Sequence, residues 1–361
     1  MSVTWVRRSR TVFGVFMISA VTSVTSTVAQ AQDIPRTADG RPDLSGTYDV
    51  ASLTPLQRPV ELGDRFELTE EEAAELAVRE QARRAARNRN SDPDRDAPPV
   101  GGDGSAGASG NVGGYNSFWI DRGRGGFQID GQWRTSIIVD PDNGRRPALT
   151  PEGRHRARVR AERRRPNTGR AWWLETDLTA TGPYDDPELR PLAERCLLGF
   201  GSTSGPPMLP VLYNNLKRVV QTQDHVMILV EMVHDARIIR LNQEHAPPDI
   251  RKWLGDSVGH WEGDTLVVDT TNFGDNPALN LASRDLHVVE RFTRVDDETL
   301  LYQFRVDDPT IWTAPWSGEY VWPSTNDRVY EYACHEANYS LGGILRGARI
   351  LEAEARGEQP E

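Results

Sequence analysis

Beyond its first 31 residues, the sequence lacks any apolar run that approaches the roughly 20 residues needed to cross a bilayer. A transmembrane segment is therefore excluded from the rest of the chain. A basic excess is also lacking, because 42 Lys and Arg residues stand against 53 Asp and Glu residues, for a net charge of −11. An acidic surface repels phosphate groups, so the composition argues against nucleic acid as a partner and disfavours anionic membrane surfaces.

Sequence motifs for metals and nucleotides are missing as well. There is no His-Glu-x-x-His and no His-x-His, and residues 101–114 are Gly-rich without the strand and helix that frame a phosphate-binding loop. Tyr213 and Lys217 have the spacing of a dehydrogenase pair, but no nucleotide-binding βαβ unit precedes them. The Gly-rich residues 199–202 do not match the nucleophile motif of hydrolases. We therefore expect no cofactor and no metal, with a metal site assembled from scattered side chains as the open alternative.

The first 31 residues have the layout of a secretory signal peptide. Arg7, Arg8 and Arg10 precede a largely apolar run, which ends at Ala29-Gln30-Ala31, a small-x-small cleavage pattern. A membrane anchor is the alternative, but Ser and Thr residues dilute the run. The segment therefore predicts cleavage after Ala31 and a periplasmic or secreted protein.

Only two cysteines occur, Cys196 and Cys334. Two cysteines of one exported chain are commonly paired in an oxidising compartment, so a disulfide is predicted between them. Two buried free thiols are the alternative. A catalytic cysteine is not favoured, because it would need an environment that stabilises the thiolate.

The mature chain divides into an N-terminal extension and a β-rich domain. The extension, residues 32–114, contains a possible short strand at 44–50 and one helix that Thr69 and Glu72 begin with a capping box and that ends near Arg87. Its basic later part is interpreted as a solvated helix face. Residues 88–114 are rich in Gly, Asp and Pro and are interpreted as a linker.

Residues 115–361 are expected to form the β-rich domain. We predict a hairpin from 134–139 and 145–149 around Asn143-Gly144, a helix at 150–165 and a C-terminal helix at 341–354. Seven further strands are predicted at 219–223, 226–232, 237–241, 265–273, 287–295, 299–306 and 329–334. Their short connections indicate antiparallel neighbours. The predicted fold is mainly β, an antiparallel lipocalin-like barrel or a sandwich with peripheral helices.

Histidine is concentrated in the second half, where six of the seven histidines lie between residues 225 and 335. Histidine is the usual acid–base group near neutral pH. Strand alternation puts His225, Met227, Leu229 and Glu231 on one face. It likewise groups His287, Val289 and Arg291 opposite Glu290 and Phe292, and Glu331, Ala333 and His335 opposite Tyr330, Tyr332 and Cys334. We take the acid and base from one pool: His225, Glu231, His234, His260, His287, Glu290 and His335.

Substrate-binding candidates are cationic or aromatic. Arg237 or Arg291 would hold an anionic group, and Trp261, Trp312 and Tyr332 would contact an apolar or aromatic ligand. Core packing of the aromatic residues and solvent exposure of the charged ones are the competing interpretations. The expected partner is a small molecule, and the oligomeric state stays open.

Several segments together are similar to a family of exported bacterial proteins of unknown function, found in soil and marine bacteria. The segments are 194–197, 234–239, 253–257, 259–273, 286–294 and 330–339. The resemblance covers about residues 115–352. It implies export and one β-rich domain, and it carries over no reaction and no catalytic residue.

Three functional hypotheses follow from these patterns. The first is a periplasmic enzyme that acts on a small molecule by His/Glu acid–base chemistry, as a lyase, isomerase or hydrolase. The second is a lipocalin-like binding protein for an apolar or aromatic ligand. The third is an envelope-associated interaction module.

Overall fold

The computed structural model describes residues 34–88, 94, 96, 120–163, 169–174, 182–336 and 338–358. The predicted signal peptide and most of the predicted linker lie outside these residues. Residues 33–361 form one unit by their contacts, and the fold below is that of this unit. None of its described helices combines the length and the apolar character that a membrane span requires.

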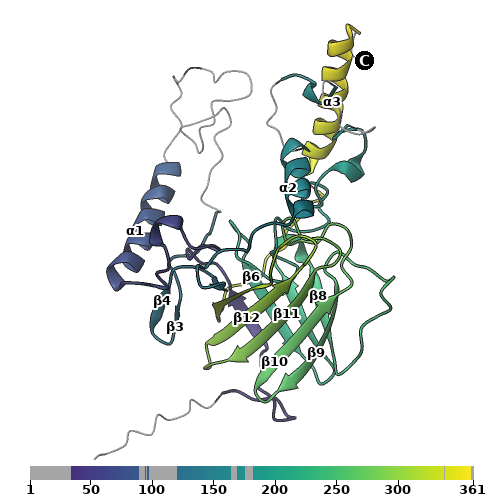
Figure 1. Cartoon of the computed structure of the whole chain (residues 1–361). Coiled ribbons are helices and arrows are strands. Elements are labelled where there is room, and N and C mark those ends of the chain that lie inside the picture. The colour runs from purple at the N-terminus through teal and green to yellow at the C-terminus, as the bar shows by residue number, and fades with distance from the viewer. Residues whose placement is uncertain are drawn as a thin grey trace, which may run out of the picture. The chain divides into compact units, whose positions relative to one another are not determined.

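Ten strands form one curled, barrel-like sheet (Figure 1). Every neighbouring pair is antiparallel except β8 and β9, and β1 approaches the far side of the sheet through a bridge between Tyr48 and Ser324. In sheet order the strands are β1 (Gly46–Asp49), β6 (Leu216–Gln221), β7 (His225–Val230), β8 (Ala236–Leu241), β9 (Asp256–Glu262), β10 (Thr265–Thr271), β11 (His287–Arg294), β12 (Thr299–Asp307), β13 (Trp316–Pro323) and β5 (Ile138–Asp140).

The mainly β fold is confirmed, whereas the antiparallel lipocalin-like arrangement is confirmed only in part. The sheet is mixed because residues 242–255, between β8 and β9, are long enough to return the chain to the starting end of β8. Strand β9 was not predicted, since Gly259 and His260 interrupt its apolar alternation. Strand β13 was also missed.

Two predicted strands are wrong. The chain turns at Gly144, whose amide donates to the Pro141 carbonyl at 2.8 Å, but residues 145–149 do not return along β5. Strand β5 pairs with β13 instead, and Leu149 makes one bridge to Trp312. Residues 329–334 form no strand, so the alternation assumed there does not apply.

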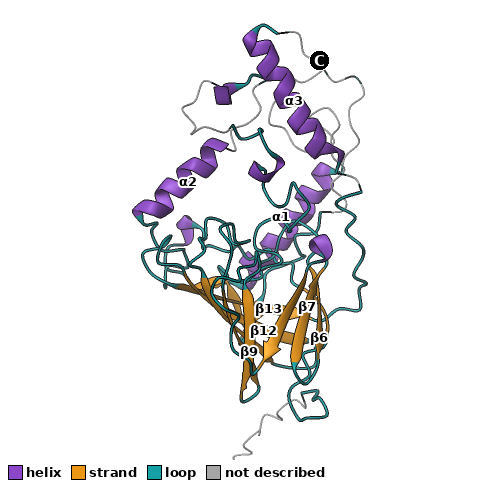
Figure 2. Ribbon diagram, turned by 90° about the vertical axis from the view of Figure 1, so that its right-hand side faces the viewer, coloured by secondary structure: helices purple, strands orange, loops and turns teal. Residues whose placement is uncertain are grey.

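Three α-helices lie beyond one end of the strands in both views (Figures 1 and 2). They are α1 (Glu70–Arg87), α2 (Pro151–Arg163) and α3 (Tyr339–Arg356), and all three were predicted. The capping box of Thr69 and Glu72 at the start of α1 is confirmed. A small sheet of β2 (Glu67–Leu68), β4 (Gln132–Arg134) and β3 (Gln128–Ile129), and the 3-10 helices η1 (Val60–Leu62), η2 (Trp172–Leu174), η3 (Pro187–Leu189) and η4 (Met232–His234), complete the fold.

The concave face of the sheet is filled by side chains. Tyr302 lies at the centre of this core, with its ring centroid 4.8 Å from that of Trp322, 5.0 Å from Phe292 and 5.5 Å from Tyr320. All four residues are at most 2 % exposed. The inward positions of β10 to β13 are the even-numbered ones, which places Glu290 inside and His287 outside. The predicted alternation of β11 is therefore confirmed.

A buried ion pair crosses this core. Arg237, on β8, binds both carboxylate oxygens of Glu290, on β11, and its remaining nitrogen donates to Ser257 at 3.0 Å. Glu290 also accepts a hydrogen bond from the Tyr302 hydroxyl at 2.8 Å. Arg237 is 3 % exposed and Glu290 is fully buried. A buried charge needs this degree of hydrogen bonding to be tolerated.

We expect Glu290→Gln to lower the free energy of unfolding by about 3–5 kcal/mol, because it leaves the Arg237 guanidinium buried without a counter-charge. Urea denaturation followed by tryptophan fluorescence measures the change. The control is Glu262→Gln, since Glu262 pairs with Arg291 on the exposed face of the sheet. Equal effects of the two substitutions would contradict a special role for the buried pair.

Candidate functional site

The structure does not bring the seven predicted acid–base residues into one pocket. His225, His260 and His287 lie on the convex face of the sheet, and Glu290 lies in the core. Glu231 and His234 lie just after β7, where the alternation of that strand no longer holds, so Glu231 does not share the face of His225, Met227 and Leu229. The seventh, His335, is exposed in the segment before α3.

The predicted substrate-binding residues are also dispersed. Arg237 is engaged by Glu290, whereas Arg291 binds Glu262 on the convex face at 2.9 Å. Trp312 is 2 % exposed and packs edge-on against Trp316. Trp261 is half-buried with Arg41 over its ring, and half-buried Tyr332 stacks on Tyr213. The sites suggested by geometry therefore differ from the predicted pool.

A cleft with a volume of about 1000 Å³ lies beside α1 and is here called the α1 cleft. Its walls are residues 52–56, one face of α1, residues 209–213, Phe200 and Met232. Leucine and other apolar side chains supply most of this lining, and Arg79, Arg83 and Arg122 supply positive charge. A largely apolar concavity with a few polar groups is the usual form of a small-molecule site.

The sequence of α1 explains its place in the wall. Ala73 and Leu76, three residues apart, lie on the side of the helix that faces the protein, and Ala73 is buried. Val78, on the other side, is 63 % exposed. The basic later part of the helix was interpreted as a solvated face, whereas Arg79, Glu80 and Arg83 of that part line the α1 cleft.

The opposite wall is fixed to the core. Residues 202–209 are all buried, and the Met208 amide donates to the Tyr302 hydroxyl at 2.9 Å. The Met208 carbonyl accepts from the Tyr320 hydroxyl at 2.6 Å. These two bonds hold Leu209 and the residues after it at the edge of the α1 cleft.

Buried titratable groups surround η4, which contains Met232 of the cleft lining. Lys217, on β6, is fully buried, and its ammonium group hydrogen-bonds to Thr203 at 3.1 Å. Burial lowers the pKa of Lys217 to about 7, against the opposing influence of Glu231 and Asp235. Burial also raises the pKa of Asp235. Such perturbed groups beside a cleft are typical of functional sites.

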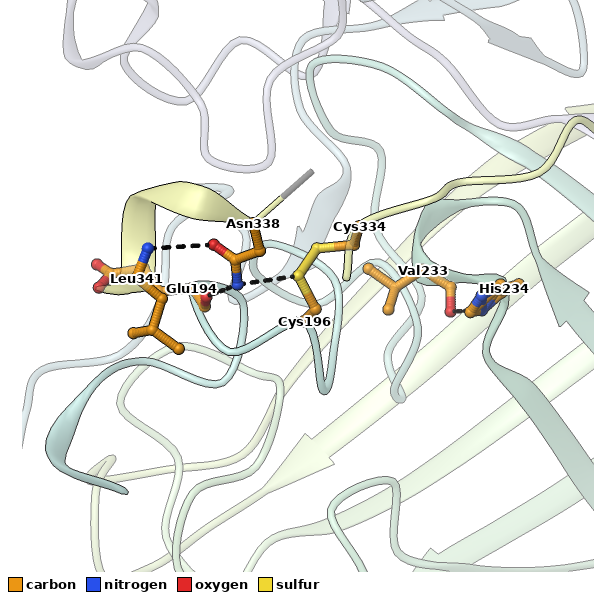
Figure 3. Close-up of a disulfide and its surroundings, with 7 residues drawn as sticks. All are labelled: Glu194, Cys196, Val233, His234, Cys334, Asn338 and Leu341. Carbon is orange, nitrogen blue, oxygen red and sulfur yellow. Dashed lines mark hydrogen bonds between the residues drawn. A yellow bond between two sulfur atoms is a disulfide. The ribbon is translucent and has the colours of Figure 1, made fainter. Parts of the chain in front are cut away.

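The backbone between Glu231 and Asp235 is strained at two residues. Val233 has φ of 60° and His234 has φ of 45°, in the left-handed region that β-branched side chains avoid. The side chain of His234 contacts the carbonyl of Val233 (Figure 3). Strained residues of this kind cluster at functional sites, at a cost of about 1–3 kcal/mol each.

A disulfide joins Cys196 to Cys334 beside this segment, as predicted (Figure 3). It attaches residues 324–336, which lack helix and strand, to the loop before the buried residues 202–209. The amides of Ser324 and Thr325 hold the start of the segment by donating to Glu298 at 2.6 Å and to Thr47 at 2.8 Å. Further along, the Tyr330 amide donates to Glu231 at 3.2 Å, and the Tyr332 ring stacks on Tyr213 with ring centroids 6.4 Å apart. The disulfide thus fixes the far end of a segment whose start is held by Ser324 and Thr325.

Two histidines on the convex face share one carboxylate. His245 Nε2 lies 2.9 Å from Asp269 Oδ1, and His287 Nε2 lies 2.8 Å from Asp269 Oδ2. His245 Nδ1 also lies 3.2 Å from Asp256. A neutral imidazole has one N–H, so His245 makes both bonds only when it is protonated.

The charges of this group are mutually supported. The hydrogen bond from His287 to Asp269 raises the pKa of His287. Burial alone would raise the pKa of Asp269, but the bonds from His287 and His245 outweigh burial and lower it. Asp307, the cross-strand neighbour of His287, adds to the raised pKa by its charge. No second hydrogen bond of the His287 ring occurs within the described ranges, which leaves Nδ1 available for proton transfer.

Two residues were missed by the sequence analysis, Asp269 of the histidine group and the buried Lys217. Asp269 was missed because it stands in the predicted strand 265–273 as a single acidic residue, and Lys217 was considered only with Tyr213. Lys217 lies two residues before Val219, so both side chains face the core, and this spacing was the signal that could have found Lys217.

Gly255-x-Ser257-x-Gly259 also matches the hydrolase motif, but Ser257 is 3 % exposed within a strand and bonded to Arg237.

No group of three or more His, Cys, Asp or Glu side chains placed to hold a metal occurs in the described part of the chain. No protein-family model matches the sequence, and no curated protein matches it significantly. The resemblance to exported bacterial proteins therefore stays a prediction.

We expect Cys196→Ser with Cys334→Ser to lower the free energy of unfolding by about 4–5 kcal/mol, because the bond closes a long loop in the unfolded chain. Hydrogen exchange by mass spectrometry should show faster exchange at residues 324–336 than in β10 and β11. The wild type treated with reductant should behave like the double variant. Unchanged exchange at 324–336 would show that other contacts hold the segment.

The His287 pKa should lie above its usual value of about 6.5, and Asp269→Asn should return it toward that value. The ion pair therefore stabilises the fold fully below pH about 6.5, and this contribution is lost as the pH rises through the raised pKa. Imidazole NMR resonances followed against pH measure the titration. Glu262→Gln, which removes the partner of His260, is the control and should leave His287 unchanged.

Proposed function

We propose that the protein binds a small organic molecule with a large apolar part in the α1 cleft. The α1 cleft is the observation that carries this proposal, because its volume of about 1000 Å³ and its mostly apolar lining suit a small molecule. This proposal keeps the hypothesis of a binding protein but places the ligand in the α1 cleft, outside the core of the sheet. The filled core of the sheet argues against a ligand among Trp322, Tyr302 and Phe292.

The proposed location is the periplasm or the extracellular medium. The Cys196–Cys334 disulfide is compatible with an extracytoplasmic protein, since such bonds persist in oxidising compartments. The secretory layout of residues 1–31 supports the same location. An exported binding protein would meet its ligand outside the cytoplasm.

Acid–base catalysis is the second candidate, and the pair His287–Asp269 favours it. A carboxylate that orients one nitrogen of an imidazole and leaves the other available is the arrangement of a general base. The pair lies on the convex face of the sheet, so this activity would be separate from the α1 cleft. A His287 pKa without an upward shift would remove the support for it.

N-phenyl-1-naphthylamine, a neutral fluorescent probe, should bind in the α1 cleft. Leu76→Gln should weaken this binding about tenfold, because it places an amide where the cleft wall is apolar. The control is Val78→Gln on the exposed side of the same helix. Fluorescence titration measures both affinities, and circular dichroism checks that α1 is retained.

An equal loss in the two variants would indicate that the probe binds outside the α1 cleft. No saturable binding by the wild type would contradict the proposed function. Binding that Leu76→Gln weakens and Val78→Gln leaves intact supports the α1 cleft as the site.

A further inference from the structure

We infer that the ligand of the α1 cleft is an amphipathic organic anion, whose acidic group is bound by arginines of α1. This inference rests on the proposed function and names the chemical class of its ligand. The juxtaposition that carries it is an apolar floor beside a positively charged rim.

The charge of the α1 cleft is opposite to that of the chain. Three arginines and one glutamate line it, whereas the whole chain carries a net charge of −11. On an acidic protein, a local positive site attracts anions that the remaining surface repels. The excess of arginine over acidic residues in the lining is therefore a local feature of the α1 cleft, opposite in sign to the charge of the whole chain.

Two of these arginines have the spacing to act together. Arg79 and Arg83 are four residues apart on α1, so their side chains leave the helix on the same face. Both line the α1 cleft, beside Leu76 one turn earlier. Glu80 already takes the Nε and Nη2 donors of Arg83, which leaves Nη1 for a ligand. Arg79 is exposed and can bind a carboxylate or sulfonate through two parallel hydrogen bonds, which favours an anionic head group at this position.

The only acidic residue of the lining neutralises the rim in part, because its single negative charge is shared between two arginines and three arginines line the cleft. Glu80 is mostly buried, with its side chain 10 % exposed, and it binds both Arg83 and Arg84. Arg79 reaches only Glu75, at 3.6 Å, and both of those side chains are 61 % exposed. An exposed pair of this kind is weak, so Arg79 can exchange Glu75 for a ligand at little cost.

The apolar part of the ligand has its own contacts. Leu53, Leu56 and Leu209 lie in the walls opposite α1, and Met232 closes one side. A molecule whose acidic group meets Arg79 and Arg83 would place its hydrocarbon or aromatic part against these side chains. A cation of the same shape would meet repulsion at the rim, and a neutral molecule would gain nothing there.

The test compares probes that differ in charge on the full mature chain. Anilinonaphthalene sulfonate carries a sulfonate on the ring system of the neutral N-phenyl-1-naphthylamine. We expect the sulfonate to bind about tenfold more tightly at low salt, and 0.5 M NaCl to reduce this preference. Decanoate should displace the sulfonate at lower concentration than decyltrimethylammonium does.

Arg79→Gln with Arg83→Gln should remove the preference for the sulfonate and leave the affinity for the neutral probe. The control is Arg305→Gln with Arg356→Gln, which makes the same change of charge at exposed arginines outside the α1 cleft. The thermal midpoint of each variant checks the fold. If the arginine pair proved necessary for folding, the salt dependence of the wild type would still decide the question.

The outcomes separate the inference from the proposed function. Equal affinity for both naphthalene probes, or a preference for decyltrimethylammonium, would overturn the inference while the α1 cleft remained a binding site. Failure of every probe to bind would overturn both. A preference for the anions that is lost in the α1 variant and kept in the control supports the inference.

Discussion

The hydroxyl group of Tyr302 joins the two polar systems on which the structure depends. It donates to Glu290, which holds Arg237 across the core, and it accepts from the Met208 amide, which positions the wall of the α1 cleft. A buried hydroxyl that both donates and accepts leaves none of these partners unsatisfied. The aromatic core and the α1 cleft are therefore parts of one hydrogen-bonded arrangement.

This arrangement explains why the α1 cleft lies at the end of the sheet. Tyr302, Trp322 and Phe292 occupy the space that a barrel of this kind can use for a ligand. The α1 cleft is formed instead where the strands end and η4, α1 and residues 209–213 meet. The strained backbone at Val233, the buried Lys217 and the segment attached by Cys334 lie next to it, so binding at the cleft can influence these groups.

Much of the fold was predictable because strands with strong alternation are self-evident in a sequence. Strands β7 and β12 have apolar residues at every second position, and β8, β10 and β11 keep enough of this alternation to be recognised, whereas β9 is interrupted by Gly259 and His260. The sequence predicted which residues of β11 share a face, and it also contained the information on which face is buried. Val288 and Phe292 share the parity of Glu290, and this already indicated that Glu290 faces the core and His287 the solvent.

The site was much less predictable. The α1 cleft is assembled from Leu53, Leu76, Leu209 and Met232, which lie far apart in the chain and are individually ordinary. The concentration of histidine at 225–335 predicted the region of the His287–Asp269 pair but not its partner, because a shared carboxylate depends on strand register. The disulfide was predictable, since only one pairing exists for two cysteines.

That disulfide has a consequence for survival in a protease-rich space. Cys196 precedes β6 and Cys334 follows β13, so the covalent ring between them contains eight of the ten strands of the large sheet. A single cut in any loop from residue 197 to residue 333 opens the ring but releases no fragment. Both pieces stay attached through the sulfur atoms, and the hydrogen-bonded sheet can keep them in register.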